Sequence, residues 1–430
     1  MNKSLLFLAV VSACSAAGSA PALAESEQSI KLANSCYASF NSGSYEEAFK
    51  NCSAAAADND AEASNLLGAM YENGWGTDQD FSKAVDYYKK AANADLADAN
   101  NNLANMYKEG KGVDADESEA HYYYEKAARL GDSNANLSLG NMVSDPKSSY
   151  YSKDQAEKYY RLSADAGNDL AQVALAKELI SQNDINGALP YLEKSAEKNN
   201  PDGMELLAGF YRNGTGVRAD PAKAFELYKK SADLGNKNAA LETARAYRDG
   251  VGTDVNFAEA LKYYDKACQA KIQEAMIESG MMYLRGQGTE PDVTKGLDLL
   301  QKAASMKNLD AIRTIAELYS NGKYIPISAE KAFSYYYRCA GYGDPECETQ
   351  AGIMLVKGAG TSKDVVEGVG WLVKAADEKT YVPAMLTLAD VYYTSKYGYM
   401  DHEACKRYLR LAAENGSKEA SERLMQLDFE

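Results

Sequence analysis

The sequence predicts an all-α solenoid built from antiparallel helix pairs. A tyrosine recurs every 36 residues through the middle of the chain, and glycine doublets and pairs of small residues recur with it. The tyrosines are Tyr211, Tyr247, Tyr283 and Tyr319, and the doublets are Gly214/Gly216, Gly250/Gly252 and Gly286/Gly288. A fixed period of this length is typical of repeat arrays, in which each unit buries its apolar face against its neighbours.

Residues 201–236 show why each repeat should contain two helices. Apolar residues up to Tyr211 lie at helical spacing, and the glycine-rich stretch RNGTGVRAD should end that helix because glycine readily adopts positive φ. Asp220 can then cap a second helix, and Pro221 suits its first turn. One face of this second helix carries Ala224, Leu227, Tyr228, Ser231 and Ala232.

The stretch LLAGFYRNGTGVRADPAKAFELYKKSADLGN, residues 206–236, resembles the Sel-one-like repeat, a relative of the tetratricopeptide repeat. Similar stretches are NLLGAMYENGWGTDQDFSKAVDYYKKAA and NLANMYKEGKGVDADESEAHYYYEKAA. The resemblance covers nearly all of the chain after its first residues. It implies a right-handed superhelical α-solenoid that acts as an adaptor scaffold, and it leaves the identity of the partner open.

Taken in order, the chain is expected to hold an export signal (1–24), a tetratricopeptide-like capping unit (25–59), a repeat array (60–417) and a capping helix (418–430). The expected repeats are 60–95, 96–132, 133–169, 170–200, 201–236, 237–272, 273–308, 309–344, 345–380 and 381–417. The units 133–169 and 170–200 lack the glycine doublet. This difference indicates either ordinary drift within the array or a change of superhelical curvature over residues 144–186.

The first residues are typical of an export signal. Lys3 supplies a positive start, residues 5–11 form a short apolar run, and Ala22-Leu23-Ala24 is a small-x-small cleavage site. Cleavage between Ala24 and Glu25 would leave a periplasmic or secreted protein. The alternative is a lipobox-like stretch that ends at Cys14, which would leave a lipid anchor there. No later stretch approaches the roughly 20 apolar residues that span a bilayer.

Composition and motifs argue against several classes of function. The formal charge of −16 opposes non-specific binding to nucleic acid or to an anionic membrane. The only two histidines, His121 and His402, are far apart, so no metal site is expected. No phosphate-binding GxxxxGK[ST] loop is present, and the recurrent glycine doublets are expected to be turns. We therefore expect no cofactor.

The cysteines indicate structural roles. Cys36 and Cys52 fall in the two expected helices of the first unit, at positions that should face each other, and a disulfide would staple this terminal hairpin in an exported protein. The secreted, cysteine-rich branch of the family has a disulfide across an eight-residue spacing, and the resemblance implies the same for Cys339 and Cys347. Cys268 and Cys405 are expected to be buried small residues.

Part of that branch is associated with penicillin binding and β-lactamase activity, which makes a serine acyl-enzyme a remote alternative. Ser-x-x-Lys occurs at Ser144–Lys147, Ser195–Lys198 and Ser328–Lys331, but the Ser-Asp-Asn and Lys-Thr-Gly elements are absent. No pair of carboxylates stands out either. We therefore expect a protein without catalytic residues.

The first helix of each unit lines the concave, ligand-binding face in related solenoids. Exposed first-helix positions here form an asparagine group and an arginine group, both suited to a protein or peptide ligand. The candidate residues are Asn101, Asn102 and Asn105, with Asn65, Asn134 and Asn141 nearby, and Arg212, Arg245, Arg248, Arg285 and Arg313. The alternative is that the arginines pair with Asp249, Glu242, Glu278 or Glu317 and that the asparagines bond between helices.

The tyrosine stripe has a helical period, so it is expected to form core and not a carbohydrate platform. Its members are Tyr87, Tyr88, Tyr123, Tyr124, Tyr159, Tyr160, Tyr263, Tyr264, Tyr335 and Tyr336. The predicted function is that of an exported scaffold for protein–protein or protein–peptide interaction in the bacterial envelope. A secreted factor that binds a host protein is the alternative.

Overall fold

The computed structural model describes residues 27–398 and 400–427. The predicted export signal, its cleavage site after Ala24 and the alternative anchor at Cys14 lie outside the described residues. The described part contains 23 α-helices and no β-strand, which confirms the all-α prediction. The chain divides into two compact units, residues 1–191 and 192–430, and the boundary between them lies within helix α10 (Ile185–Glu197).

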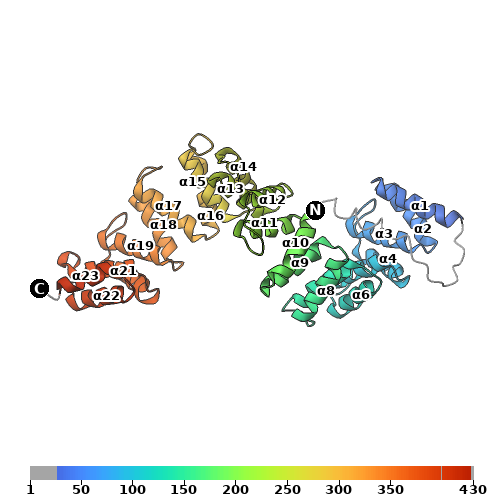
Figure 1. Ribbon diagram of the computed structural model, residues 1–430, viewed down its shortest axis with the longest axis horizontal. Helices are drawn as coiled ribbons and strands as arrows, with labels where there is room; N and C mark the ends of the chain where they lie inside the picture. The colour runs from blue at the N-terminus through green and yellow to red at the C-terminus, as the bar shows by residue number, and fades with distance from the viewer. Residues whose placement is uncertain (1–26, 399, 428–430) are drawn as a thin grey trace. The chain divides into compact units, whose positions relative to one another are not determined.

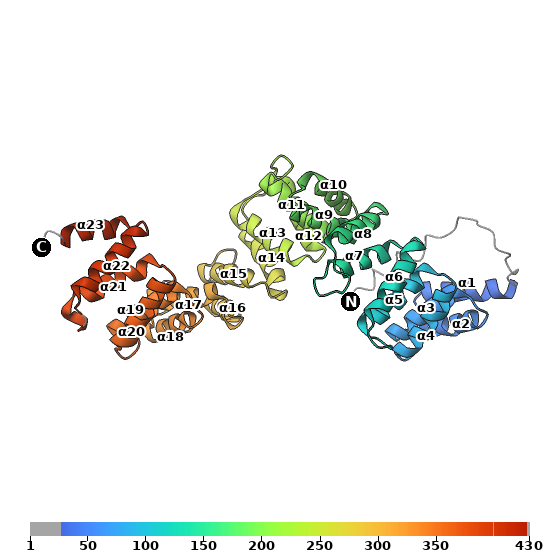
Figure 2. The ribbon, with the colours of Figure 1, turned by 90° about the horizontal axis from the view of Figure 1, so that it is seen from below.

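The helices of the first unit form consecutive hairpins (Figure 1). Figure 2 shows α1 to α4 lying side by side as two such pairs. Their bounds are α1 (Glu27–Asn41), α2 (Tyr45–Ala57), α3 (Ala61–Asn73), α4 (Phe81–Asn93), α5 (Ala97–Glu109), α6 (Glu117–Arg129), α7 (Ser133–Ser144), α8 (Lys153–Asp165), α9 (Asp169–Ser181) and α10 (Ile185–Glu197).

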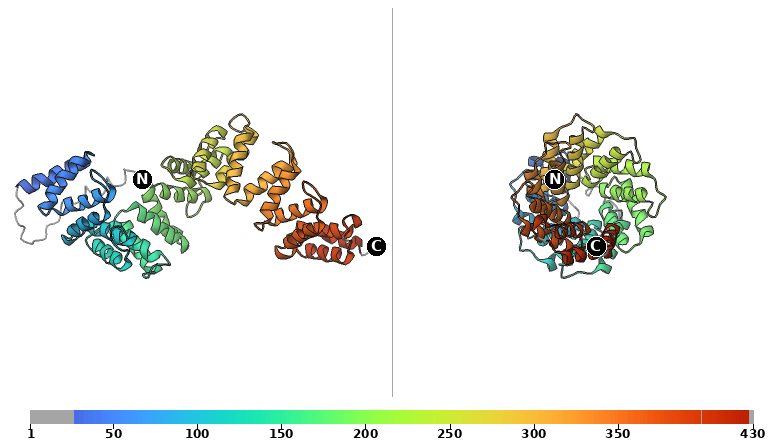
Figure 3. Two further views of the ribbon diagram at one scale, coloured as in Figure 1. Left: turned by 180° about the vertical axis from the view of Figure 1, so that it is seen from behind. Right: turned by 90° about the vertical axis from the view of Figure 1, so that its left-hand side faces the viewer.

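The second unit repeats the hairpin pattern to the carboxyl end of the described chain, where Figure 3 shows the helices in orange to red. A π-helical turn over Lys374–Glu378 follows α20, and a 3₁₀ turn over Ser395–Tyr397 follows α21. The α-helices are α11 (Pro201–Asn213), α12 (Pro221–Asp233), α13 (Lys237–Asp249), α14 (Phe257–Gln269), α15 (Gln273–Arg285), α16 (Val293–Ser305), α17 (Leu309–Asn321), α18 (Ala329–Ala340), α19 (Pro345–Lys357), α20 (Val365–Val373), α21 (Val382–Tyr393), α22 (His402–Glu414) and α23 (Lys418–Leu427).

Helix ends follow the local signals of the repeat. Gly214 ends α11 in the left-handed conformation with φ of 70°, as a glycine C-cap does. Asp220 caps α12 because its carboxylate accepts the backbone N–H of Lys223 at 3.0 Å. Pro221 occupies the first helical turn, where the missing N–H costs no hydrogen bond.

The second glycine of the doublet places each loop on the preceding repeat. A Cβ added to Gly252, which has φ of +75°, would lie 2.0 Å from the carbonyl oxygen of Pro221. A Cβ on Gly76 would lie 2.1 Å from the carbonyl oxygen of Tyr45. Only glycine permits so close an approach, so the loop after a first helix lies against the start of the previous second helix.

The tyrosine stripe is core, as predicted. Tyr88, Tyr124, Tyr263 and Tyr264 are among the largest fully buried side chains, while Tyr87, Tyr123, Tyr159 and Tyr335 are half-buried. Rings at the half-buried positions stack on the tyrosine of the first helix, as Tyr87 does on Tyr71. These stacked pairs take up one face of each ring.

Two disulfides join the cysteine pairs that the sequence analysis singled out. Cys36 and Cys52 link α1 to α2, and Cys339 and Cys347 link the end of α18 to the start of α19. Cys405 is buried as expected, whereas Cys268 is only half-buried, with its Sγ 3.5 Å from Oγ of Ser279.

A loop without a glycine doublet follows α7. Ser148 and Ser149 both donate from their hydroxyls to the carboxylate of Glu117, each at 2.6 Å, and His121 stacks on Tyr150 with ring centroids 4.1 Å apart. The loop thus contacts the second helix of the preceding repeat, as the glycine loops do, through different side chains. A change of superhelical curvature over residues 144–186 stays a prediction.

Among the described residues, no helix combines the length and the apolar character that crossing a membrane requires. The described side chains that come together in a metal-ligating combination are Cys339, Asp344 and Cys347. The two sulfurs there form a disulfide, so neither is a thiolate ligand.

Candidate protein-binding face

The asparagines of the first unit make hydrogen bonds between helices. Asn102 donates to the side-chain oxygen of Asn65 at 3.0 Å, and Asn105 accepts the hydroxyl of Tyr124 at 2.5 Å. Within the described part of the chain, the buried side-chain oxygen of Asn101 has no hydrogen-bond partner. Much of this row therefore joins neighbouring helices, and its role in binding a partner stays a prediction.

The arginines of the second unit form a ladder with carboxylates across α11, α13 and α15. Arg212 pairs with Glu242, and Arg245 contacts the other oxygen of Glu242 at 3.1 Å. On its far side, Arg245 donates from Nε to Glu278 at 3.0 Å. Each carboxylate thus serves two arginines, because Arg248 also pairs with Glu278.

Arg248 is fully engaged by its neighbours. Its Nε and Nη2 donate to the two oxygens of Asp249, each at 2.7 Å, and its Nη1 donates to the hydroxyl of Tyr264 at 3.0 Å. This bidentate geometry is the strongest form of an arginine–carboxylate pair. Of the predicted partners, Asp249, Glu242 and Glu278 are therefore paired with the arginines, as the alternative interpretation expected.

The pKa values of Glu278 and Asp249 are lowered, so these two carboxylates of the ladder are stabilised as anions. Burial raises the pKa of Glu278, but hydrogen bonds from Arg245 and Tyr264 and the nearby arginine charges outweigh it, so the net pKa is lowered. A hydrogen bond from Arg248 lowers the pKa of Asp249. The ladder thus consists of guanidinium and carboxylate groups in nearly equal number, with little net charge.

The last two arginines have different surroundings. Arg313 pairs with Asp344 at 3.0 Å and with Glu346 at 3.4 Å, and not with Glu317. Arg285 is exposed and lies beside Tyr324, whose pKa is raised by burial but lowered on balance by hydrogen bonds from Lys323 and Arg285. Arg285 is thus more open to solvent than Arg245 or Arg248.

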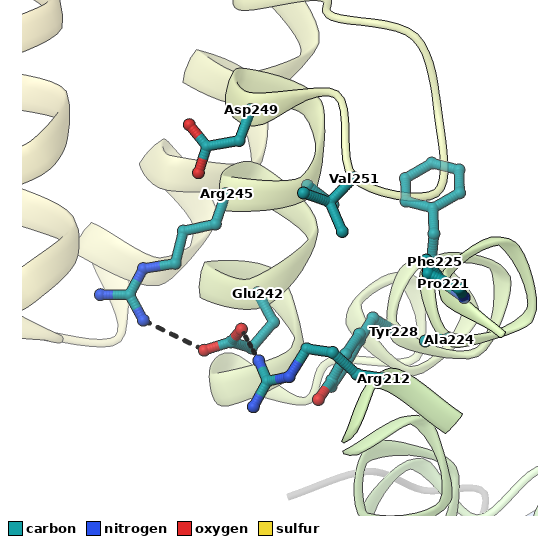
Figure 4. A pocket seen from close by; sticks show the side chains of 10 residues that line it. Arg212, Pro221, Ala224, Phe225, Tyr228, Glu242, Arg245, Asp249 and Val251 are labelled. Atoms are coloured by element: carbon teal, nitrogen blue, oxygen red, sulfur yellow. Dashed lines mark hydrogen bonds and ion pairs between the residues drawn. The ribbon is translucent and has the colours of Figure 1, made fainter. Parts of the chain in front are cut away.

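A cavity of about 200 Å³ adjoins the ladder between α12 and α13 (Figure 4). Its walls are mainly apolar, and the charged side chains stand at its rim, where Figure 4 shows Glu242 bridging Arg212 and Arg245. The lining residues are Arg212, Pro221, Ala224, Phe225, Tyr228, Glu242, Arg245, Ala246, Asp249 and Val251.

Sequence reasoning found the arginines at the rim but missed the cavity. Its loop residue is Val251, at a position where the two adjacent repeats carry Thr215 and Gln287. An alignment of the repeats shows this difference from the adjacent repeats. It does not show that Phe225 and Val251 lie around the same space, because they belong to successive repeats.

Two serines of the three Ser-x-x-Lys matches hydrogen-bond the backbone at helix ends. Ser144 donates to the backbone carbonyl of Asn141 at 3.0 Å, Ser195 is fully buried, and Ser328 caps α18 by accepting the N–H of Lys331. The side chain of Lys331 lies over the ring of Tyr319, with Nζ 4.9 Å from its centroid. Ser144 thus bonds the backbone at the end of α7, and Ser328 bonds the backbone at the start of α18.

The fold is similar to that of solved bacterial repeat proteins. A protective antigen of uropathogenic Escherichia coli with an SLR fold is 24% identical, with a TM-score of 0.69 over 93% of this chain and 89% of that chain. A Sel1 repeat protein from Oxalobacter formigenes is 24% identical, with a TM-score of 0.48 over 56% of this chain and 98% of that chain. Helicobacter pylori cysteine rich protein B is 29% identical over 29% of this chain and 91% of that chain, with a TM-score of 0.26.

No curated protein matches the chain significantly. The Sel1 repeat model matches it in nine stretches, 61–96, 97–132, 147–168, 201–236, 238–271, 273–308, 310–340, 345–379 and 382–417. These stretches cover well over half of the sequence, and the helix hairpins and the likeness to the SLR fold agree with them. The chain belongs to the Sel1 repeat family.

Proposed function

We propose that this protein is a non-catalytic scaffold of the bacterial cell envelope that holds a partner protein or peptide on the first helices of its second unit. Sel1 repeat proteins are protein-interaction scaffolds, which supports the general class. The observation that carries the choice of face is the apolar cavity beside Arg212 and Arg245. Apolar space with a few fixed charged groups at its edge is typical of binding sites.

Arg212 is the ladder residue best suited to a partner's carboxylate. Its side chain is 42% exposed and pairs with Glu242, whereas Arg248 is held on several sides. A guanidinium carries five N–H donors, so Arg212 can bind a second carboxylate without releasing the first. Arg245 and Arg248 hold Glu242 and Glu278 in place and so orient the group that binds.

The proposed location rests on the export signal in residues 1–24. The acidic character of the protein is compatible with the proposal, since a charge of −16 disfavours nucleic-acid partners. Fractionation of cells, with mass spectrometry of the amino terminus, tests it directly. A terminus at Glu25 in the periplasm supports the envelope adaptor, protein in the medium supports the secreted alternative, and a lipidated Cys14 supports the anchored form. An unprocessed cytoplasmic protein would contradict export.

The binding face is tested by photo-cross-linking in living cells with the full chain. A photoreactive amino acid replaces Arg212 on the proposed face or Glu226, an exposed residue of α12, as the control. We expect one partner to be captured from position 212 and not from position 226. The purified partner should then bind at least tenfold more weakly to Arg212→Ala than to the unmodified protein. Equal capture from both positions, or unchanged affinity, would contradict the proposed face.

A further inference from the structure

The site between the second helix of one repeat and the loop of the next occurs in both units, but its filling differs. In the first unit the loop after α3 reads Gly74-Trp75-Gly76, and in the second the loop after α13 reads Gly250-Val251-Gly252. Both glycines of each loop have φ near 70°, and the second packs on the first residue of α2 or α12. Trp75 and Val251 therefore occupy equivalent places.

The rings around these two places match as well. Phe49 contacts Tyr71 edge to face with centroids 5.4 Å apart, and Phe225 contacts Tyr247 in the same way at 5.0 Å. In each case the phenylalanine lies five residues into its second helix, and the tyrosine lies near the end of the next first helix. The frame of the site is thus the same, and the loop side chain is what differs.

In the first unit the chain fills the site with an indole. The ring of Trp75 stacks on Tyr45 at 5.5 Å and lies 5.8 Å from Phe40. In the second unit the corresponding residues are Val251, Pro221 and Arg212, and all three line the cavity of about 200 Å³. A cavity of roughly 150 Å³ lined by apolar groups is enough to bind benzene, so this one has room for an aromatic ring.

We propose that this cavity receives a bulky aromatic side chain, an indole above all, from the partner that binds the first helices of the second unit. The inference rests on the proposed function and specifies the chemistry of the partner. A partner residue in the cavity would lie against Phe225, Tyr228 and Val251, as Trp75 lies against Phe40 and Tyr45. Tryptophan and tyrosine are the side chains that most often dominate binding energy when they enter such pockets.

The rim favours tryptophan or tyrosine over an aliphatic anchor. Carboxylates of Glu242 and Asp249 stand at the edge of the cavity, where they can accept an N–H or O–H from the inserted ring. The same chain shows such a contact on α20, where the indole N–H of Trp371 donates to Glu367 at 3.3 Å. Leucine or methionine offers no donor to these groups.

A library of random 12-residue peptides displayed on phage and selected on the full-length protein tests the proposal. The key variant is Val251→Trp, which supplies from the chain the ring that the cavity would take from a partner. The matched control is Val255→Trp, in the same loop, where the valine is 54% exposed against 46% for Val251 and does not line the cavity. A second filling variant is Ala246→Leu, which narrows the cavity from α13.

We expect the selected peptides to share a tryptophan or tyrosine. Their affinity should fall at least tenfold for Val251→Trp and for Ala246→Leu, and stay within twofold for Val255→Trp. Selected peptides that lack an aromatic residue, or that bind Val251→Trp as well as the unmodified protein, would overturn the cavity proposal. An absence of any selected peptide would overturn it too, and the cross-linking from position 212 would still decide the proposed function separately.

Discussion

The site between α2 and α3 and the site between α12 and α13 share one backbone frame. The first is filled by a side chain of the protein, and the second is a cavity. The first is closed by Trp75, which packs on Phe40 and Tyr45, within a hairpin stapled by the Cys36–Cys52 disulfide. The second is open at Val251 and bordered by charged groups. The same frame can therefore either be filled by a side chain of its own loop or leave space beside a smaller one.

A second difference concerns the side chain that each repeat extends to its neighbour. In the second unit the cap residue of α13, Asn236, donates its amide to Asp202 at 2.7 Å. In the first unit the corresponding cap residue of α7 is Asp132, whose charge acts on Asp98. Burial and the charge of Asp132 raise the pKa of Asp98, and burial raises that of Asp132 despite its cap hydrogen bonds. One unit thus has an amide–carboxylate pair where the other has two carboxylates.

Removal of the Cys36–Cys52 disulfide should have the largest effect on stability among the changes that we predict. The double change Cys36→Ala and Cys52→Ala opens a loop of 16 residues, and chain entropy then costs about 3 kcal/mol of stability. Among the described helices, α1 and α2 pack on each other and on α3. We therefore expect them to unfold locally, with loss of hydrogen-exchange protection in α1 and α2. Retained hydrogen-exchange protection in α1 and α2 would show that the contacts among Phe40, Tyr45 and Trp75 stabilise the hairpin without the disulfide.

Opening the closed site tests whether the indole is what stabilises it. Trp75→Val gives the first unit the loop residue of the second, and the half-buried indole is worth about 2 kcal/mol. Hydrogen exchange should therefore become faster in α2 and α3. Val255→Trp, on an exposed loop position of the other unit, serves as the control for a change of aromatic content. Unchanged exchange in α2 and α3 would contradict the equivalence of the two sites.

Exchanging the cap residue should remove the difference between the carboxylate pairs. In Asp132→Asn the amide keeps the cap and can donate to Asp98, so we expect stability at pH 7 to rise by about 1 kcal/mol. Because the pKa values of Asp98 and Asp132 are raised in the folded protein, ionising these two carboxyls at pH 7 destabilises the fold. This destabilisation disappears as the pH falls through the raised pKa values toward the ordinary aspartate value of about 4. The free energy of unfolding by urea should therefore differ less between Asp132→Asn and the unmodified protein as the pH is lowered.

The reciprocal change, Asn236→Asp, places a second carboxylate beside Asp202 and should destabilise the second unit at pH 7. An advantage of Asp132→Asn that is independent of pH would contradict the interpretation, because a change in helix capping alone does not require protonation of Asp98.

The smallest effect is expected in the ladder itself. Arg245→Met removes the ion pairs of a partly exposed side chain with Glu242 and Glu278. The free energy of unfolding at pH 7 should therefore fall by less than about 1 kcal/mol. The pKa of Glu278 is lowered, so its contribution is present above the ordinary glutamate pKa and is lost as the pH falls through the lowered value. The difference between variant and unmodified protein should therefore vanish in acid.

Arg161→Met, which breaks the exposed Arg161–Glu157 pair within α8, is the matched control and should have a smaller effect at every pH. A loss from Arg245→Met that persists in acid would mean that the arginine acts by packing and not through Glu278.

Much of the fold was predictable because its signals are local and repeated. The cap at Asp220, the glycine ends of the first helices and the helical spacing of the tyrosines each act within one repeat of 36 residues. The Cys36–Cys52 disulfide was predictable for a related reason, since both cysteines lie in one hairpin, whereas the Cys339–Cys347 disulfide followed from the family resemblance. The position of the arginine row also followed from the period.

The sequence by itself thus determined the helix hairpins, their order and the residues along the first helices. Only the tertiary structure decided which arginines are held and where a cavity remains. Arg212 meets Glu242 thirty residues away, and Phe225 and Val251 border one space from successive repeats. The physical reason is that a helix is specified by neighbours a few residues apart, whereas a site between repeats depends on how side chains of two units fill their common volume.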